Sequence, residues 1–217
     1  MLKTPFEHAG YLIDQRTVGP FQTNSFLMLC TQTREAVLID SCAEFTVLKA
    51  MIETHDAEIV ALLQTHAHLD HVGALAEMQD WTDAPIFLHP HEQPLYEALP
   101  MQCELFGLPK MPTPPPYDHP LHEGEEITFG HCTLRVLETP GHTPGGVTFV
   151  TERLALVGDT LFASSIGRSD LPGGDASVLM QSLQRLMELD DDTVVCAGHG
   201  PLTTIGQERT HNPFLIA

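Results

Sequence analysis

The sequence predicts an α/β protein in which sheets are covered by helices. Short apolar runs typical of strands alternate with amphipathic helical patterns in both halves of the chain, and this alternation is typical of sheets with helices packed on them. No low-complexity linker or repeat of solenoid length divides the 217 residues, and single domains of this length are common. The prediction is therefore one α/β domain spanning residues 1–217.

The first half of the chain begins with a predicted strand pair, residues 25–30 (SFLMLC) and 35–40 (EAVLID), around the polar turn TQTR. A helix follows, because four apolar residues are spaced for one helical face: Phe45, Leu48, Met51 and Ile52. Three further elements are expected before the middle of the chain: strand 58–64, helix 74–78 and strand 85–89.

The second half contains five predicted strands: 127–129, 133–138, 146–150, 154–158 and 193–197. The clearest helix pattern spans Ser177–Leu189, with Asp175 or Ser177 as its N-cap. Between the halves, residues 109–120 contain six prolines. This segment is either a stiff spacer or a rigid loop that forms the wall of a substrate pocket.

Charge and composition narrow the classes of partner and compartment. The formal charge is −19, from 10 Lys and Arg against 29 Asp and Glu, and such a surface repels nucleic acid and anionic membranes. The start of the chain lacks the apolar core of a signal peptide, and no run approaches a membrane span. The five cysteines form no C-x-x-C pair, which predicts buried reduced thiols in a cytoplasmic protein.

Residues 65–73, THAHLDHVG, follow a predicted strand and crowd four potential metal ligands into six positions: His66, His68, Asp70 and His71. Three other strands also end on such a residue: His142 in TPGHTPGG, Asp159 after LALVG, and His199 in GHG. Ligands gather at the carboxyl ends of strands in open sheets. Imidazole and carboxylate without a thiolate set suit Zn²⁺, Fe or Mn²⁺, so a metal centre is predicted.

The other histidines are expected to be surface or hydrogen-bonded residues, because an isolated histidine is rarely a ligand: His8, His55, His91, His119, His122, His131 and His211. His89, at the end of the run PIFLH, is expected to be structural.

This constellation resembles the metallo-β-lactamase superfamily, with matching motifs from VLIDSC to CAGHGP. The resemblance implies an αββα sandwich of two facing mixed sheets flanked by helices. It also implies two ions, most readily Zn²⁺ with Fe or Mn²⁺ possible. The first ion takes His66, His68 and His142, the second takes Asp70, His71 and His199, and Asp159 bridges them. Asp70 and Asp159 would thus be catalytic, and Asp40 would hydrogen-bond a ligand from outside the metal site.

Within the superfamily, GDTLFASSIGRSDLPGGD (158–175) and the ending GHGPLTTIGQERTHNPFL (198–215) are most similar to short glyoxalase II-type hydrolases. Full-length glyoxalase II carries a helical C-terminal domain that contributes to glutathione binding, and only 18 residues (217 − 199) follow His199 here. The implied activity is hydrolysis of an S-D-lactoylglutathione-like hydroxyacyl thioester by a metal-bridging hydroxide. The partner is a small-molecule thioester, with no nucleic acid and no membrane, and the oligomeric state is not predicted.

Several alternatives remain. A persulfide dioxygenase would share these motifs but use one iron, held by His66, His142 and Asp159. A lactonase is a weaker option. A secreted β-lactamase is not expected, because it needs an export signal. Nucleic-acid-processing members are not expected either, because they carry extra domains or basic surfaces. A structural zinc site is usually richer in thiolates. Arg168, in the stretch Arg168-Ser169-Asp170, either grips a substrate carboxylate or closes a surface turn with Asp170.

Overall fold

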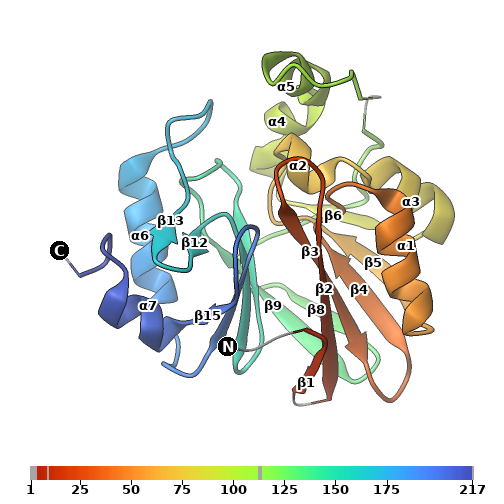
Figure 1. The fold of residues 1–217 in the computed structure, drawn as a ribbon, viewed down its shortest axis with the longest axis horizontal. Coiled ribbons are helices and arrows are strands. Elements are labelled where there is room, and N and C mark those ends of the chain that lie inside the picture. Colours follow the sequence, from red (N-terminus) through yellow and green to blue (C-terminus); the bar gives the residue numbers. More distant parts are fainter. Residues whose placement is uncertain (1–3, 9, 112–113, 217) are drawn as a thin grey trace. The chain divides into compact units, whose positions relative to one another are not determined.

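The computed structural model describes residues 4–8, 10–111 and 114–216. Its contacts divide the chain into two compact units. The N-terminal unit comprises Thr4–Leu121 and Thr128–Cys132, and the C-terminal unit comprises His122–Ile127 and residues 133–216. Figure 1 labels the elements of both units.

The N-terminal unit is built on a seven-stranded mixed sheet in the order β1-β2-β3-β4-β5-β6-β7. Pairing is antiparallel from β1 to β4 and parallel from β4 to β7. The strands are β1 Phe6–His8, β2 Tyr11–Val18, β3 Thr23–Cys30, β4 Glu35–Ile39, β5 Glu58–Leu63, β6 Ile86–Leu88 and β7 His119–Pro120. The predicted pairing of the runs 25–30 and 35–40 is confirmed by the antiparallel register of β3 and β4.

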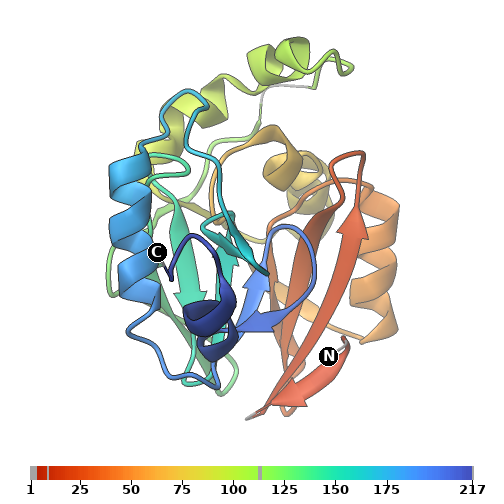
Figure 2. The same cartoon turned by 60° about the vertical axis from the view of Figure 1, so that its left-hand side comes forward.

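Helices α1 (Phe45–Thr54) and α3 (Leu75–Thr82) contact each other and strands of this sheet, as Figure 2 shows for α1 beside the long N-terminal strands. α1 buries Leu48, Met51 and Ile52 of the predicted helical face in the core. Four shorter helical segments complete the unit: α2 Leu69–Val72, the 3₁₀ turn η1 Pro90–Glu92, α4 Gln93–Glu97 and α5 Leu99–Leu105.

The C-terminal unit contains a second mixed sheet in the order β15-β14-β11-β10-β9-β8. β11 and β14 pair in parallel, whereas the pairs β9–β10, β10–β11 and β14–β15 are antiparallel. The strands are β8 Glu126–Phe129, β9 Cys132–Glu138, β10 Val147–Val150, β11 Leu154–Gly158, β14 Val194–Ala197 and β15 Thr203–Thr204. A separate hairpin pairs β12 Leu161–Phe162 with β13 Ser165–Ile166.

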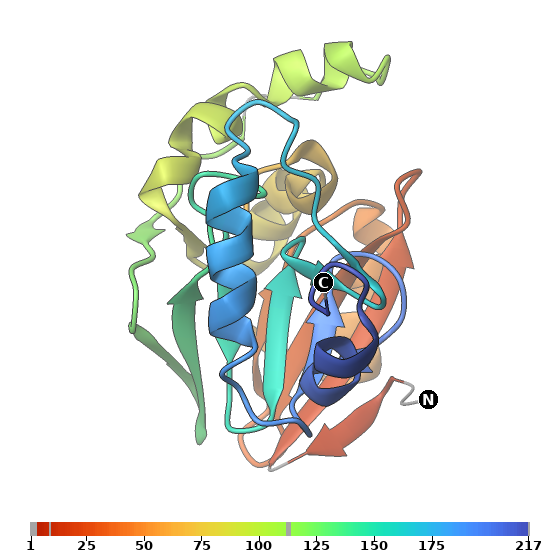
Figure 3. The same ribbon diagram turned by 90° about the vertical axis from the view of Figure 1, so that its left-hand side faces the viewer.

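Helix α6 (Ala176–Leu186) lies along this sheet in Figure 3, with α7 (Ile205–His211) near its lower part. Asp175 is the N-cap, since its Oδ1 accepts hydrogen bonds from the amides of Ser177 and Val178. Leu179, Leu183 and Leu186 are buried among residues of β10, β11 and β14. The helix is shorter than its pattern predicted, because the chain turns after Leu186 and Met187 serves as the C-cap.

Several elements were not predicted from the sequence, mainly β1, β2, α4, α5, α7 and β15. β2 reads YLIDQRTV and mixes polar and apolar residues, because it lies next to an edge strand and buries only part of its length. Helix α3 extends to Thr82, beyond the 74–78 expected. In the Pro-rich segment, His119–Pro120 pairs with β6, while residues 112–113 lie outside the described part.

Both units thus carry a mixed sheet with helices on it, which confirms the predicted α/β class. All five cysteines are buried, and none of them forms a disulfide within the described residues. None of the helices in the described residues has the length and apolar character needed to cross a bilayer.

Candidate functional site

In the N-terminal unit, the candidate ligands lie where β5 ends and α2 begins. His66 and His68 stand in the extended loop, and Asp70 and His71 lie in the single turn of α2. The ring centroid of His66 is 4.9 Å from that of His68 and 4.0 Å from that of His71. The loop and the short helix therefore gather all three imidazoles, as the spacing H-x-H-x-D-H predicted.

The backbone of this loop is held at alternate residues by buried side chains. The amide of Ala67 donates to Glu92 Oε2 over 2.7 Å, and the amide of Leu69 donates to Gln102 Oε1 over 2.9 Å. Gln102 Nε2 in turn donates to the carbonyl of Ala67 over 3.0 Å. Because the residues between the histidines are fixed, His66 and His68 project from a defined backbone.

Asp40 anchors the start of the same loop from the end of β4, where its backbone adopts a left-handed conformation with φ of 58°. Its Oδ1 accepts from the Thr65 amide over 2.7 Å. Its Oδ2 accepts from the Thr65 hydroxyl and is 2.8 Å from His71 Nδ1. An ionised carboxylate only accepts, so His71 carries its proton on Nδ1 and presents the lone pair of Nε2.

The same reasoning applies to His66. The Thr65 hydroxyl gives its proton to Asp40, so it accepts from His66 Nδ1, which is 3.0 Å away. His66 therefore also presents an unprotonated Nε2. A hydrogen bond from Nδ1 to an acceptor is the usual way in which proteins orient histidines that bind metals.

Asp70 is linked to the sheet by Thr23, the first residue of β3, whose hydroxyl donates to Asp70 Oδ2 over 2.9 Å. The same oxygen is 3.6 Å from His71 Nε2. This separation is too long for a hydrogen bond, so the two atoms are neighbours without a shared proton.

In the C-terminal unit, His142, Asp159 and His199 follow β9, β11 and β14, respectively. Asp159 Oδ2 is 3.6 Å from His142 Nε2 and 3.4 Å from His199 Nε2. His142 Nδ1 is 2.6 Å from the carbonyl oxygen of Arg168. It must donate there, because a carbonyl oxygen only accepts. His142 thus presents Nε2 in the way that His66 and His71 do.

Gly167 allows the chain to pass close to Asp159. A Cβ at this position would lie 1.8 Å from the Asp159 carbonyl oxygen and 3.4 Å from the Cβ of His142. Any larger residue would displace the segment whose carbonyl orients His142. The close packing against Asp159 therefore explains why the G-R-S-D stretch begins with a glycine.

The guanidinium of Arg168 forms two hydrogen bonds with Asp170, of 2.7 and 2.8 Å. Both side chains are exposed, and the hydrogen bonds from Arg168 hold the pKa of Asp170 below its ordinary value. This is the surface turn that the sequence allowed as one alternative. The role of Arg168 in binding substrate stays a prediction.

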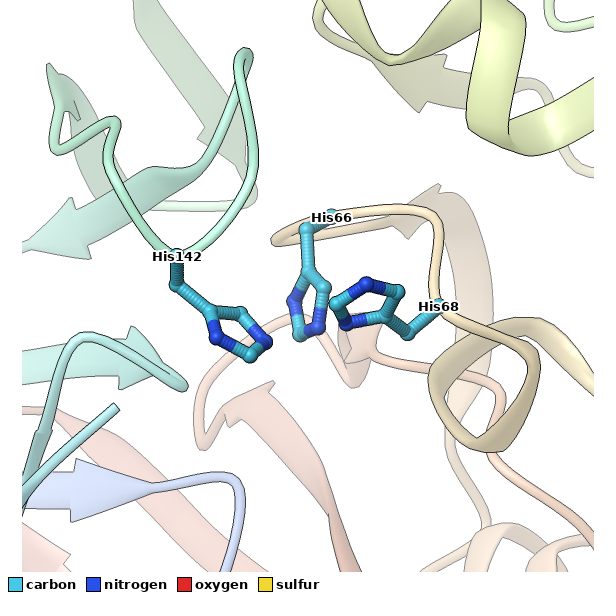
Figure 4. A group of neighbouring side chains, drawn as sticks. All are labelled: His66, His68 and His142. Carbon is cyan, nitrogen blue, oxygen red and sulfur yellow. The ribbon is translucent and has the colours of Figure 1, made fainter. Parts of the chain in front are cut away.

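The spacing of the ligand atoms suits a metal ion. Two atoms each about 2.1 Å from a tetrahedral Zn²⁺ lie about 3.4 Å apart. The three nitrogen–oxygen separations in the two units are 3.4, 3.6 and 3.6 Å. These histidines and aspartates are candidate metal ligands. Figure 4 shows His66 and His68 on the loop after β5 and His142 on the loop after β9.

A cavity of about 440 Å³ lies within the N-terminal unit, next to Asp70. Apolar side chains dominate its wall: Val18, Pro20, Phe21, Leu69, Leu108 and Met111. Thr23, Asp70, Glu77 and Lys110 contribute the polar groups. Because Pro109, Lys110 and Met111 line it, the first part of the Pro-rich segment is a pocket wall.

Sequence reasoning missed Glu92, Gln102, Thr65 and Thr23, which orient the ligands but belong to no ligand motif. Glu92 is fully buried, and a buried carboxylate needs partners, but burial is not readable from its neighbours in the sequence. His89, expected to be structural, caps η1 by accepting from the His91 amide over 3.2 Å. His55, expected to be hydrogen-bonded, pairs with Asp14 over 2.8 Å.

Comparison with known proteins agrees with these features. Residues 18–199 match the model of the metallo-beta-lactamase superfamily. Hydroxyacylglutathione hydrolase GloC of Haemophilus influenzae is 39% identical over 202 residues, which cover 91% of this chain and 95% of that protein.

Two solved structures share the fold at similar identity. The BLEG-1 B3 metallo-beta-lactamase has a TM-score of 0.88 and 38% identity, covering 94% of this chain and 100% of that one. TTHA1623 in a di-iron-bound form has a TM-score of 0.85 and 43% identity, covering 93% of this chain and 99% of that one. The motifs, the fold and these likenesses together establish that the chain belongs to the metallo-β-lactamase superfamily.

Proposed function

We propose that the protein is a dinuclear-metal thioester hydrolase of the glyoxalase II type. The observation that carries the proposal is the position of Asp159, whose Oδ2 lies beside both His142 and His199. Those histidines are expected to serve different ions, so one carboxylate beside both suits a bridging ligand. The likeness to a hydroxyacylglutathione hydrolase and to a di-iron-bound structure supports both parts of the proposal.

In this proposal, each ion has four protein ligands. The first ion is held by His66, His68, His142 and Asp159, and the second by Asp70, His71, His199 and Asp159. Zn²⁺ is the expected metal, with Fe or Mn²⁺ as alternatives, because imidazole and carboxylate suit all three. When bound, such ions lower the pKa of a coordinated water to about 7 and polarise a carbonyl group.

The residues of this chain supply orientation and binding. Asp40 and the Arg168 carbonyl hold the Nδ1 protons of His71 and His142, and Thr23 holds Asp70. The cavity beside Asp70 would take the acyl group, since its wall is mostly apolar and one of its polar atoms belongs to a proposed ligand. Arg168 remains a proposed contact for a substrate carboxylate, reached if its pair with Asp170 opens.

The leaving group argues for a thioester. Among the described residues of the two clusters, every imidazole and carboxylate is assigned to a metal or, for Asp40, to a ligand. A thiol of pKa about 8.5 can leave as thiolate without prior protonation, whereas a positioned acid is worth about 10²–10⁴-fold for a poorer leaving group. We expect the thioester to exceed the matched oxygen ester widely in kcat/KM, with the amide almost untouched.

The test combines metal analysis of protein purified without added metal with four assays: hydrolysis of S-D-lactoylglutathione, hydrolysis of a lactone, oxygen uptake with glutathione persulfide, and cleavage of a chromogenic cephalosporin. About two ions per chain and thioester hydrolysis alone are expected. One iron with oxygen uptake would replace the proposal with a persulfide dioxygenase. Dominant cleavage of the cephalosporin, or a lactone as good as the thioester, would replace it with those activities.

The bridging role is tested separately with Asp159→Asn, which removes the shared carboxylate and should deplete both ions, whereas His71→Ala should deplete mainly one. Asp175→Asn is the matched control in the same unit, because asparagine also caps helices well. Full metal content and turnover in Asp159→Asn would show that the bridging assignment is wrong.

A further inference from the structure

A pair of cysteines lies at the end of β3 that is far from the metal ligands. Thr23 at the start of β3 bonds Asp70, and Cys30 is the last residue of the strand. Seven residues of strand separate them, which is about 23 Å. Cys132, the first residue of β9, belongs to the same unit as Cys30 and contacts it.

Hydrogen-bond donors converge on the sulfur of Cys30. The His131 amide points to Sγ from 3.5 Å, and the Thr33 hydroxyl and the amides of Gln32 and Thr33 add further hydrogen bonds. Burial alone would raise the pKa of this thiol, but the donors outweigh it and lower the pKa to about 6. The nearby carboxylate of Glu35 is itself held by the Gly130 amide at 2.8 Å.

Cys132 has the opposite environment. Its burial and its hydrogen-bond contact with Cys30 raise its pKa to about 12, and its thiol donates to the Gly10 carbonyl oxygen over 3.7 Å. The surroundings of Cys30 thus favour the thiolate, whereas those of Cys132 favour the thiol. A low-pKa thiolate next to a second cysteine is the arrangement found in redox-active dithiols.

Exposed residues of two turns lie next to the two cysteines in the sequence. Gln32, Gly130 and His131 are exposed, while Cys30 and Cys132 are 1% and 4% exposed. A Cβ on Gly130 would lie 2.8 Å from Cys30 Sγ and 2.1 Å from Thr33 Oγ1. The absence of a side chain at 130 thus leaves room for Cys30 Sγ and Thr33 Oγ1.

We propose that Cys30 and Cys132 form a peroxide-sensitive dithiol that closes to a disulfide, with a hydroperoxide as the oxidant. The Cys30 thiolate attacks the peroxide, the O–O bond breaks, and an S–O bond forms to give a sulfenic acid and, after protonation, an alcohol or water. The sulfur of Cys132 then attacks Cys30, the S–O bond breaks, and hydroxide leaves with the Cys132 proton as water. Two thiols are oxidised and one peroxide is reduced.

The test exposes the full-length folded protein to hydrogen peroxide at near-stoichiometric amounts and maps its cysteines by mass spectrometry after alkylation. The expected product is a Cys30–Cys132 linked peptide, with Cys42, Cys103 and Cys196 still alkylated. In Cys132→Ser, Cys30 should instead be trapped by dimedone as sulfenic acid. In Cys30→Ser, neither the link nor a dimedone adduct on Cys132 should form.

Cys103→Ser is the matched control, because Cys103 is also fully buried but lies in helix α5; it should retain the link. The rate at which iodoacetamide alkylates each cysteine of the wild-type protein at pH 7 tests the proposal without any variant. Cys30 should react before the other cysteines. Folded wild type that forms no link, or that links other cysteines equally well, would overturn the proposal. Oxidation of Cys30 directly to sulfinic acid in the presence of Cys132 would do the same.

Discussion

His71 donates its Nδ1 proton to Asp40 Oδ2 over 2.8 Å, and both side chains are almost completely buried. The two residues are 31 positions apart in the chain, and they meet because β4 and β5 are parallel neighbours. Asp40 ends β4, and the loop that leads to α2 follows β5. The contact decides which nitrogen of His71 is available to a metal ion.

We predict that Asp40→Asn weakens metal binding, because an amide NH₂ group would face one of the donors that the carboxylate now accepts. Loss of such a supporting contact typically costs about 10–100-fold in metal affinity. Competition with a chelator, followed by metal analysis, measures this. Asp14→Asn is the control, since Asp14 is also buried and paired with a histidine, His55. Equal metal loss in both variants would contradict the prediction.

We predict that Glu92→Ala destabilises the protein by about 1–3 kcal/mol, because it leaves the buried amide of Ala67 without its acceptor. Metal affinity should fall as well, since Ala67 lies between His66 and His68. Urea unfolding of the metal-free protein separates the first effect from the second. Glu53→Ala, at an exposed helical position, should stay within about 0.5 kcal/mol of the wild type. If Glu92→Ala left the free energy of unfolding and the metal affinity unchanged, the proposed support of the loop by Glu92 would be wrong.

Gly130→Ala should be more destabilising than Gly124→Ala. Both glycines have positive φ, 57° and 77°, so both substitutions introduce backbone strain. Only at Gly130 would the new methyl group also meet Thr33 Oγ1 and Cys30 Sγ, while nothing lies within 4 Å of a Cβ at Gly124. Thermal unfolding of the two variants measures how much more Gly130→Ala destabilises the protein than Gly124→Ala does. Similar losses for both would show that the turn around Cys30 shifts without cost.

Asp14 should make stability depend on pH in the acid range. Burial would raise its pKa, but hydrogen bonds from His55, Arg16 and the Gln15 amide outweigh it and lower the pKa below its ordinary value. Asp14 therefore makes its full contribution to the free energy of unfolding above about pH 4. This contribution is lost as the pH falls through the lower pKa that Asp14 has in the folded protein. The gap in unfolding free energy between metal-free wild type and Asp14→Asn should be wider at about pH 6 than at about pH 2.5. A gap that widens in acid would contradict this sign.

We keep the prediction that residues 1–217 form one domain and expect one cooperative unfolding transition. Strand β8 contributes Glu126–Ile127 to the C-terminal unit and Thr128–Phe129 to the N-terminal unit. Because the residues of this one strand are divided between the units, we expect the units to unfold together. Calorimetry of the metal-free protein, compared with urea unfolding, tests this. Two resolved transitions would divide the chain into two domains.

The sequence by itself determined most strands, because continuous apolar runs such as SFLMLC and LALVG can only be buried. It also determined the candidate ligands, because His66, His68, Asp70 and His71 are rarely crowded into six residues without a metal. The cap of α6 by Asp175 was readable for a similar reason, since capping is a local interaction.

Tertiary structure decided the residues that hold those ligands. Asp40, Glu92 and Gln102 reach the H-x-H-x-D-H loop from 25 to 35 positions away in the chain, and no local pattern encodes such distant contacts. The same is true of Cys30 and Cys132, which are in contact although one ends β3 and the other begins β9. Hydrogen-bond geometry and burial depend on what surrounds a side chain in space, so the tautomers of the histidines and the contrasting thiols became visible only in the folded chain.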